Sequence, residues 1–373
     1  EGCDQGWISS CQENTSCPDI AIMSQPGLLA ELAQEGALVD LSTFINSTVL
    51  NANYTAEWIN LGKVDGTLYG VWFNASNKSL VWYDPGEFSS HAWTSPTTWT
   101  QMISLSETIS NTTSTPPWSV GNRSGTATGW PLTDWFENIL LRSAGPDLFD
   151  DLISQDISWT HTEVISATIY FGEIFGNESY QLGGKSGTLE THFIDAMYPP
   201  FEVPPGAYLH HQGSFTSNFL QGQFPTQVPG TDYAVFSFPD IKPTYTNACM
   251  GSGDVAMVFH DTIEAQKFID YLITTDAAEM WITAGGISPN RNLDTNLYTE
   301  PNLKYAADKV ANADIFRFDL TDQLPGSLNL YVWSQMDDLV QAAPDQEAMV
   351  EVLARIELMA SDPYTVFLPN VIR

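Results

Sequence analysis

Basic residues are scarce in this sequence. Its 373 residues include 13 Lys and Arg against 45 Asp and Glu, which gives a formal net charge of −32 at pH 7. Nucleic-acid phosphates and anionic membrane surfaces are bound chiefly through Lys and Arg. The composition therefore excludes both as binding partners. Because the acidic residues do not form runs, they predict a solvated surface rather than an acidic tail.

Long apolar runs are also absent. No stretch of about 18 or more apolar residues occurs, so we expect no transmembrane helix. The sequence opens on "EGCDQGW", and no signal-peptide pattern is found there.

Cysteine is limited to four residues, Cys3, Cys11, Cys17 and Cys249. The spacings of eight and six residues between the first three do not match the close pairs of a structural zinc site. An even number of cysteines suits two disulfides with three possible pairings. The alternative is four buried thiols in a reducing compartment, and we favour the disulfides.

Motifs for catalysis and for cofactors are missing. There is no H-E-x-x-H and no G-x-S-x-G, and a phosphate loop ending at residues 184–186 would require Gly where Ser179 stands. A glycosidase needs two carboxyl groups about 5–10 Å apart. Asp134 and Glu137 share one face of a predicted helix, but a solvated helix face is the preferred interpretation. We therefore predict no enzyme activity, no metal and no cofactor.

What the sequence does contain is a high number of N-x-[ST] acceptor sites, which is typical of a secreted or cell-surface protein. The eight sites are Asn14, Asn46, Asn53, Asn74, Asn77, Asn111, Asn122 and Asn177.

Predicted strands and helices alternate along the chain, which favours an α/β fold with parallel sheets. Residues 18–23 form an apolar strand between polar turns, and a helix with Pro26 in its first turn follows. A D-G turn at residues 65–66 joins two further strands. Residues 129–145 predict a helix with Thr133 as its cap. Ligands of open α/β sheets bind at the carboxyl ends of the strands, so the turn that contains Gln25 is a candidate site.

Tryptophan is abundant, with 12 residues. Trp130, Trp135 and Trp333 stand near turns or helix starts rather than within apolar runs. Sugars are bound by aromatic rings that stack on the apolar pyranose face, beside polar groups that bond to the hydroxyls. The alternative for each single Trp is a place in the core.

Several stretches occur together in the order found in one family. The sequence resembles the extracellular solute-binding proteins of carbohydrate ABC transporters, in the α-glucoside and maltose-type branch. The stretches that carry the resemblance are "PDIAIMSQPGLLAELAQEGALVDLS" (18–42), "VDGTLYGVWF" (64–73), "KSLVWYDPGEF" (78–88), "SPTTWTQM" (95–102), "GWPLTDWFENILLRSAGPDLFD" (129–150), "GSGDVAMVF" (251–259), "ISPNRN" (287–292) and "FDLTDQLPGSLNLYVWSQMDD" (318–338).

The resemblance implies a two-lobed clamp of the periplasmic-binding-protein type (type II), with a hinge between the lobes. Residues 1–80 and 254–298 would form the first lobe, and residues 81–253 and 299–373 the second. By the family's pattern, the sequence begins after one strand and one helix of the first lobe, so that lobe is expected to lack its N-terminal strand.

The resemblance also implies a sugar site in the cleft between the lobes. The positions that match the family's cleft are Gln25, Asn77, Trp130, Asp134, Trp135, His211, Gln212 and Trp333. A glycan on Asn77 would fill this cleft, so we expect Asn77 to be unmodified and Asn74, if either of the two, to carry a glycan.

The implied function is an extracellular, non-catalytic protein that binds an oligosaccharide, with an α-glucoside as the expected type, and delivers it to an ABC transporter permease in the membrane. Two alternatives stay open at this stage. One is a structural cell-surface or filament glycoprotein that reuses the fold and self-assembles, and the other is a glycosidase.

Overall fold

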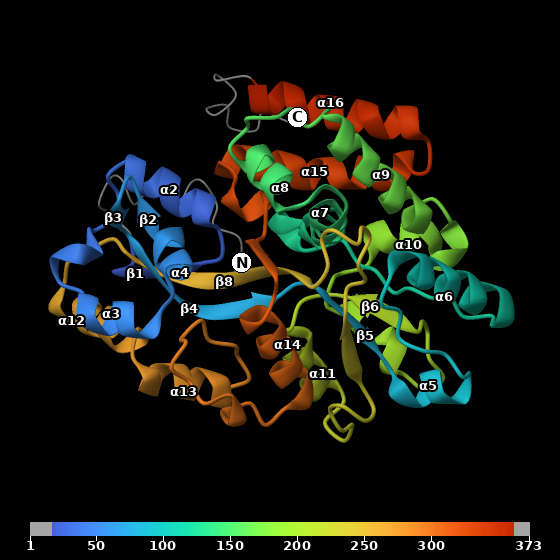
Figure 1. The fold of residues 1–373 in the computed structure, drawn as a ribbon, viewed down its shortest axis with the longest axis horizontal. Helices are drawn as coiled ribbons and strands as arrows, with labels where there is room; N and C mark the ends of the chain where they lie inside the picture. Colours follow the sequence, from blue (N-terminus) through green and yellow to red (C-terminus); the bar gives the residue numbers. More distant parts are fainter. Residues whose placement is uncertain (1–16, 362–373) are drawn as a thin grey trace.

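Two of the three β-sheets among the described residues, one of four strands and one of three, are joined by a short hinge segment and organise the protein into two lobes (Figure 1). The structure is a computed structural model, and it describes residues 17–361. The strands are β1 (Ile20–Met23), β2 (Lys63–Val64), β3 (Thr67–Leu68), β4 (Gly70–Asn77), β5 (Leu80–Tyr83), β6 (Leu209–His211), β7 (Ala234–Ser237), β8 (Ala248–Val258) and β9 (Ile315–Phe318).

Helices surround both sheets, with α16 and α15 stacked along one side of the second lobe (Figure 1). Their bounds are α2 (Pro26–Gln34), α3 (Ser47–Asn53), α4 (Ala56–Leu61), α5 (Pro85–Ser90), α6 (Trp99–Thr112), α7 (Trp130–Ala144), α8 (Pro146–Ile153), α9 (Thr162–Phe175), α10 (Gly184–Glu190), α11 (Thr216–Gln223), α12 (Ile263–Leu272), α13 (Thr275–Thr283), α14 (Pro301–Ala311), α15 (Gly326–Ala342) and α16 (Gln346–Ser361). No helix within the described residues is both long and apolar enough to cross a lipid bilayer.

The long strand β8 is the central strand of the first-lobe sheet. It pairs antiparallel with β1 and β4 and parallel with β9. In the second lobe, β5 pairs antiparallel with both β6 and β7. The α/β class is confirmed, but the prediction of parallel sheets is wrong for the described strands, since β8–β9 is their only parallel pair. Strand β4 runs opposite to β8, and β5 runs opposite to both of its neighbours, so antiparallel pairing predominates in both sheets.

Two hydrophobic clusters form the cores. The first contains Trp72 of β4 and Val255 of β8, and the second contains Trp135 of α7 and Phe171 of α9. Neighbouring side chains of β5 enter different cores, with Leu80 in the first and Val81 in the second, because successive strand residues point to opposite faces. We define the hinge segment as Asn77–Ser79, the link between β4 and β5.

The predicted lobe boundaries can be compared with these clusters. Strand β8 passes from the second cluster at Met250 to the first at Val255, near the predicted boundary at 253. Helix α14 contributes Leu303 and Ala306 to the first cluster, so first-lobe packing extends beyond the predicted limit at 298. The exact division of the chain into lobes stays a prediction.

Local sequence signals explain several elements. Strand β1 and the D-G turn between β2 and β3 are confirmed, and the turn places Asp65 at φ 50° and Gly66 at φ 82°. Both values are those of a tight hairpin turn. The predicted cap of α7 is wrong. Gly129 is the N-cap, whereas Thr133 lies within the helix and its hydroxyl donates to the carbonyl of Trp130.

The disulfide prediction fails at Cys249, which is a free, buried thiol in strand β8. Burial raises the pKa of this thiol to about 12, against smaller opposing effects of Arg142 and Lys309. Two disulfides that use all four cysteines are therefore excluded. Cys3 and Cys11 lie outside the described residues, so a disulfide among the other three cysteines stays a prediction.

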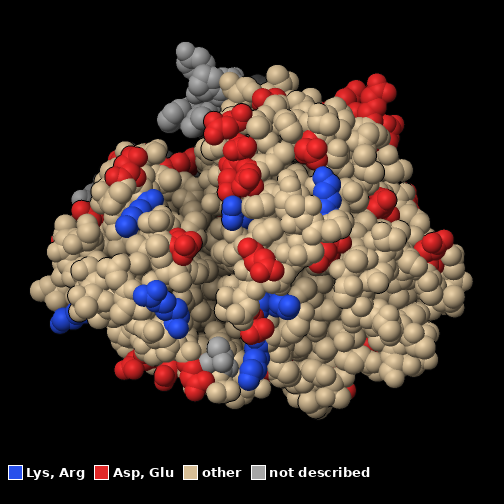
Figure 2. Space-filling model, in the orientation of Figure 1, with Lys and Arg blue, Asp and Glu red and all other residues tan. Residues whose placement is uncertain are grey.

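The acidic residues are dispersed over both lobes, with few basic residues between them (Figure 2). This distribution agrees with the solvated surface that the sequence predicts. Four carboxyl groups are an exception, because they lie buried where the lobes meet. They are those of Asp134, Glu137, Asp319 and Asp322. They belong to the site described next.

Candidate ligand-binding cleft

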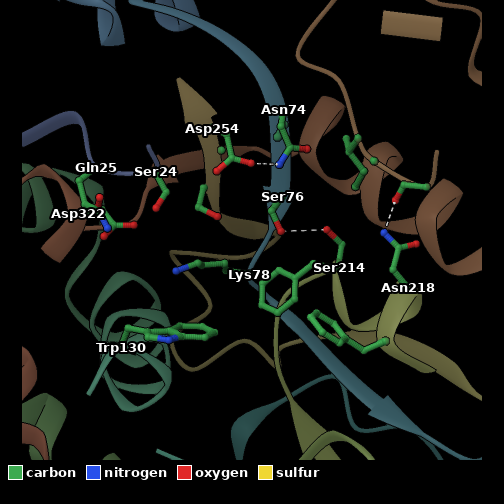
Figure 3. Close-up of a pocket in the computed structure, with 18 of the residues that line it drawn as sticks. Ser24, Gln25, Asn74, Ser76, Lys78, Trp130, Ser214, Asn218, Asp254 and Asp322 are labelled. Atoms are coloured by element: carbon green, nitrogen blue, oxygen red, sulfur yellow. Dashed lines mark hydrogen bonds between the residues drawn. The ribbon is translucent and has the colours of Figure 1, made fainter. Parts of the chain in front are cut away.

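A cavity of about 410 Å³ lies between the lobes, beside the hinge segment (Figure 3). Its first-lobe side includes the turn before α2, strand β4, the middle of β8 and the end of α13. Its other side includes the start of α7, the residues around the start of α11, and α15. The lining residues used below are Gln25, Asn74, Ser76, Lys78, Trp130, Ser214, Asp254, Trp281, Asp322 and Trp333.

The polar wall of the first lobe is a chain of hydrogen bonds. The indole N–H of Trp281 donates to Asn74 Oδ1 at 2.8 Å, and Asn74 Nδ2 donates to Asp254 Oδ2 at 2.6 Å. Gly253 permits this close pairing, because a Cβ there would lie 2.3 Å from the carbonyl oxygen of Asn74. These two hydrogen bonds hold the Asp254 carboxylate at the edge of the cavity.

A β-bulge decides which residues of β4 face the cavity. The register between β4 and β8 shifts between Trp72 and Asn74, and a bulge of this kind changes the face that later residues take. Trp72 is therefore in the core, whereas the side chains of Asn74, Ser76 and Lys78 line the cavity. Ser76 also shares a 3.0 Å hydrogen bond with the hydroxyl of Ser214 from the opposite side.

Aromatic rings line the opposite side. Trp130 starts α7 and is half-buried, with Phe193 packed edge-on at 5.1 Å between ring centroids. Gly129 adopts φ +119°, and a Cβ there would lie 2.2 Å from the carbonyl oxygen of Trp333. Only glycine fits such a position, so this residue brings α7 against α15. The indole of Trp333 donates to Thr321 Oγ1 at 3.3 Å.

Lys78 is the centre of a buried charge cluster at the hinge. Its ammonium group contacts Asp134 at 2.9 Å and Asp319 at 2.5 Å, and it lies 5.0 Å from the centre of the Trp130 ring. Burial alone would lower the pKa of Lys78, but the carboxylates of Asp134, Asp319 and Asp322 outweigh burial and raise it well above its usual value. Lys78 is therefore a permanent cation that links the hinge to the second lobe.

The carboxyl groups of the cluster cannot all be charged. Burial, followed by the charge of Asp319, raises the pKa of both Glu137 and Asp322 well above the usual range. Burial also raises the pKa of Asp134, against the opposing effect of Lys78. Burial would raise the pKa of Asp319 too, but Lys78 outweighs it and lowers this pKa. Asp319 is thus the firmly ionised partner of Lys78.

Three of the predicted cleft residues, Gln25, Trp130 and Trp333, line the cavity. Asp134 is buried behind it and contributes by holding Lys78. The remaining predicted residues are buried and do not line the cavity. These residues are Asn77, Trp135, His211 and Gln212.

These buried residues make contacts that stabilise the fold. Asn77 donates from Nδ2 to the carbonyl of Ala306 and accepts the N–H of Ser79 at Oδ1. Trp135 packs edge-on against His211 at 4.8 Å between centroids. Burial lowers the pKa of His211 to about 3, so its ring is neutral and its Nδ1–H donates to the carbonyl of Leu80 at 2.8 Å.

Sequence reasoning missed several lining residues, namely Asn74, Ser76, Lys78, Ser214, Asp254, Trp281 and Asp322. Five of the six residues in "NASNKS" are polar, so this stretch does not indicate which face of the strand lines the cavity. Choosing Asn77 selected the opposite face of the same strand. For Asp254 and Trp281 the sequence carries no comparable signal, since their contact with Asn74 spans 180 and 207 residues of chain.

The structure also places most predicted glycosylation sites. Asn46, Asn111 and Asn177 are exposed, whereas Asn53 and Asn122 are buried and donate from Nδ2 to other residues. Asn14 lies outside the described residues. A glycan on Asn74 would enter the cavity, so the prediction that Asn74 carries a glycan is incompatible with ligand binding there.

Comparison with known proteins identifies the family. Residues 10–279 match the family described as bacterial extracellular solute-binding protein. The chain belongs to this family. Among curated relatives of this solute-binding protein, the osmoprotective compounds-binding protein GgtB of Synechocystis is 39% identical over 334 residues, 89% of this chain and 78% of that protein. The alpha-glucosides-binding periplasmic protein AglE of Rhizobium meliloti is 35% identical over 337 residues, 87% of this chain and 72% of that protein.

Two solved structures with the same fold are described as sugar-binding proteins. The bacterial solute receptor AcbH, described as having an exclusive preference for β-D-galactopyranose, superposes with a TM-score of 0.81, at 19% identity, over 95% of this chain and 87% of that one. A chitin oligosaccharide binding protein superposes with a TM-score of 0.79, at 16% identity, over 95% and 86%. At these identities the likeness shows the fold alone, and it confirms the two-lobed arrangement of this solute-binding protein.

Proposed function

We propose that this solute-binding protein captures a small α-linked glucoside outside the cell and delivers it to an ABC transporter permease. The observation that carries the proposal is a cavity lined by Trp130, Trp281 and Trp333 together with the amide of Asn74 and the carboxylate of Asp254. Aromatic rings bind the apolar faces of sugars, and the polar groups bond to hydroxyls. The name of the relative AglE, which is said to bind alpha-glucosides, supports the ligand class.

The size of the cavity supports a small ligand. Its volume of about 410 Å³ is near the lower end of ligand pockets, which range over about 300–1,000 Å³. A disaccharide, or a glucose linked to a small alcohol, suits this volume better than a long oligosaccharide. A ligand that touches both walls stabilises the closed arrangement of the lobes, because it binds that arrangement more tightly than the open one.

The protein releases its ligand unchanged in this account. Asp134 is held by Lys78, and the Glu137 carboxylate accepts the backbone N–H groups of Leu320 at 2.6 Å and Thr321 at 3.2 Å. Neither carboxyl group lines the cavity, so neither is in position to protonate a glycosidic oxygen. Incubation with a chromogenic α-glucoside should release no chromophore, and hydrolysis that Glu137→Gln abolishes would overturn this part.

A structural glycoprotein is not favoured by the relatives, which are described as binding proteins. The distinguishing property is a saturable response to sugar, which a purely structural protein would lack.

Isothermal titration calorimetry with maltose, trehalose, sucrose and a glucosyl alcohol tests the proposal. At least one α-glucoside should bind, and Trp130→Ala should weaken it by about tenfold, the equivalent of about 1.4 kcal/mol. Trp93→Ala is the matched control, since Trp93 stacks on His91 and does not line the cavity. Absence of heat with every α-glucoside, or equal loss in both variants, would contradict the proposal.

A further inference from the structure

A second cavity of about 330 Å³ lies on the other face of the hinge segment. Asn77 and Ser79 line this rear cavity, whereas Lys78 between them lines the sugar cleft. Side chains of neighbouring residues in an extended chain point to opposite faces. The hinge segment therefore lies between the two cavities and contributes side chains to both.

The rear cavity carries two side chains of opposite charge that do not form an ion pair with each other. Burial raises the pKa of Asp240, against the opposing effects of Arg142, the backbone N–H of Asn247 and Lys309. Lys309 of α14 and Asp240, which follows β7, both line it, and neither takes part in an ion pair among the described residues. The Lys309 ammonium lies 5.5 Å from the centre of the Tyr305 ring, which is within the range of a cation–π contact. A ligand with one charge of each sign would satisfy both groups without adding net charge to the cavity.

Aromatic rings and small polar side chains form the rest of the wall. Phe236 and Phe238 line the cavity from the second lobe, and Tyr305 lines it from α14. The hydroxyl of Tyr305 is 2.9 Å from that of Ser237 and accepts the N–H of Ser237 at 3.2 Å. This contact joins α14 to β7 in the arrangement of the lobes described here, so the rings have a defined position before any ligand arrives.

We propose that the rear cavity is a second ligand site, which binds a small zwitterion with an anionic group toward Lys309 and a cationic group toward Asp240. Its aliphatic part contacts Phe236, Phe238 and Tyr305. This site is distinct from the sugar cleft and does not depend on which solute the cleft takes.

Helix α14 couples the two sites. Leu303, near its start, lines the sugar cleft, while Tyr305 and Lys309 line the rear cavity. A zwitterion in the rear cavity would contact α14 on one side and Phe236 and Phe238 of the second lobe on the other. It would therefore hold α14 at a fixed distance from these two residues. Closure of the sugar cleft about the hinge changes this spacing. The two ligands must then alter each other's affinity by the same factor, since the coupling free energy is reciprocal.

Calorimetric titration with glycine betaine, L-alanine and L-proline, each without sugar, tests the proposal. Propionate and ethylammonium serve as probes with a single charge. At least one zwitterion should bind, and Lys309→Met and Asp240→Asn should each weaken it by at least about tenfold. Lys304→Met is the matched control, because Lys304 is an exposed lysine of the same helix that does not line the cavity. Circular dichroism establishes that each variant is folded, and Lys309→Met alone decides the test if Asp240→Asn does not fold.

Trp130→Ala separates the two sites. Zwitterion binding should persist in this variant, whether or not sugar binding does. The proposal is overturned if no zwitterion binds, if propionate or ethylammonium binds equally well, or if Lys304→Met weakens binding as much as Lys309→Met. It is also overturned if Trp130→Ala abolishes zwitterion binding, since the ligand would then occupy the sugar cleft.

Discussion

Asn74 and Asp254 form a 2.6 Å hydrogen bond across the strand pair β4–β8, and Trp281 holds the other end of the Asn74 amide at 2.8 Å. Burial raises the pKa of Asp254, while Asn74 and Lys78 oppose this effect. The bond therefore favours the ionised carboxylate at the edge of the cavity. In this form Asp254 is an acceptor for sugar hydroxyls.

Asn74→Ala is expected to change the pH dependence of sugar binding. Binding by an ionised carboxylate is present above its pKa and is lost as pH falls through that pKa, which for Asp254 lies above the usual value. Loss of the Asn74 hydrogen bond raises this pKa further, so the acid limb of the affinity profile should move to higher pH. Calorimetric titrations over a pH series measure the shift. Asn218→Ala is the control, because Asn218 also lines the cavity but donates from Nδ2 to the carbonyl of Gly285 rather than to a carboxylate. Identical profiles for wild type and Asn74→Ala would rule out this role.

Lys78→Met is expected to destabilise the protein strongly at neutral pH. Removing one partner of a buried ion pair costs about 3–5 kcal/mol, because the other charge is left unpaired. The free energy of unfolding, measured in urea, gives this cost directly. Lys304→Met, at an exposed lysine, should change it little.

The pH dependence of that cost follows from the shifts of the cluster. The lowered pKa of Asp319 adds stability that is present above its unfolded-state pKa and is lost as pH falls through the folded-state pKa. The raised pKa values of Glu137 and Asp322 act in the opposite sense, so their contribution is lost as pH rises. Lys78→Met removes the cation that lowers the pKa of Asp319, and it also removes the cation that opposes the raised pKa values of Glu137 and Asp322. Its cost should therefore be smaller in acid than at neutral pH, and a cost independent of pH would contradict the cluster.

Gly129→Ala is expected to weaken both stability and sugar binding. The added Cβ would meet the Trp333 backbone at 2.2 Å in a left-handed conformation, and we expect a loss of at least about 2 kcal/mol in the free energy of unfolding. Gly125→Ala is the matched control, because Gly125 also has positive φ, at +61°, but no atom within 4 Å of its Cβ position. Equal losses in the two variants would mean that the contact with Trp333 is unimportant.

The buried thiol of Cys249 is expected to resist alkylation in the native protein and to react after denaturation without reduction. Burial and the raised pKa, about 12, both suppress the thiolate that reacts. Peptide mass mapping after iodoacetamide treatment measures the label on Cys249. A peptide in which Cys249 is disulfide-linked would contradict the structure.

The same mapping experiment tests glycan occupancy. Protein from a glycosylating host should carry glycan at most on the exposed acceptors Asn46, Asn111 and Asn177 among the described residues. Asn74 and Asn77 should be unmodified. A glycan on Asn74 would fill the cleft and would argue against ligand capture.

The sequence predicts the fold better than the site, and the hinge region illustrates why. Strand β5 and the change of lobe next to it follow from local apolar patterns and from the family resemblance. The face that β4 presents to the cleft depends on a bulge between Trp72 and Asn74, which no local signal marks. The sequence therefore indicates Asn77 as a cleft residue, whereas in the structure Asn74 faces the cavity.

Burial explains the other differences. Trp130 and Trp135 are equivalent candidates in the sequence, five residues apart on one helix. The packing of α7 against α9 and β6 places Trp135 in the core, while the start of the helix leaves Trp130 at the cavity. Contacts over long stretches of chain, such as Asp254 with Asn74, are visible only in the folded structure.

A crystal structure of the protein with the α-glucoside that binds most tightly in calorimetry tests the central claim most directly. The account predicts a pyranose ring in the cavity between the lobes, in contact with Trp130 or Trp333, and a hydroxyl within hydrogen-bond distance of Asp254. A sugar bound elsewhere on the protein, with this cavity empty, would contradict it.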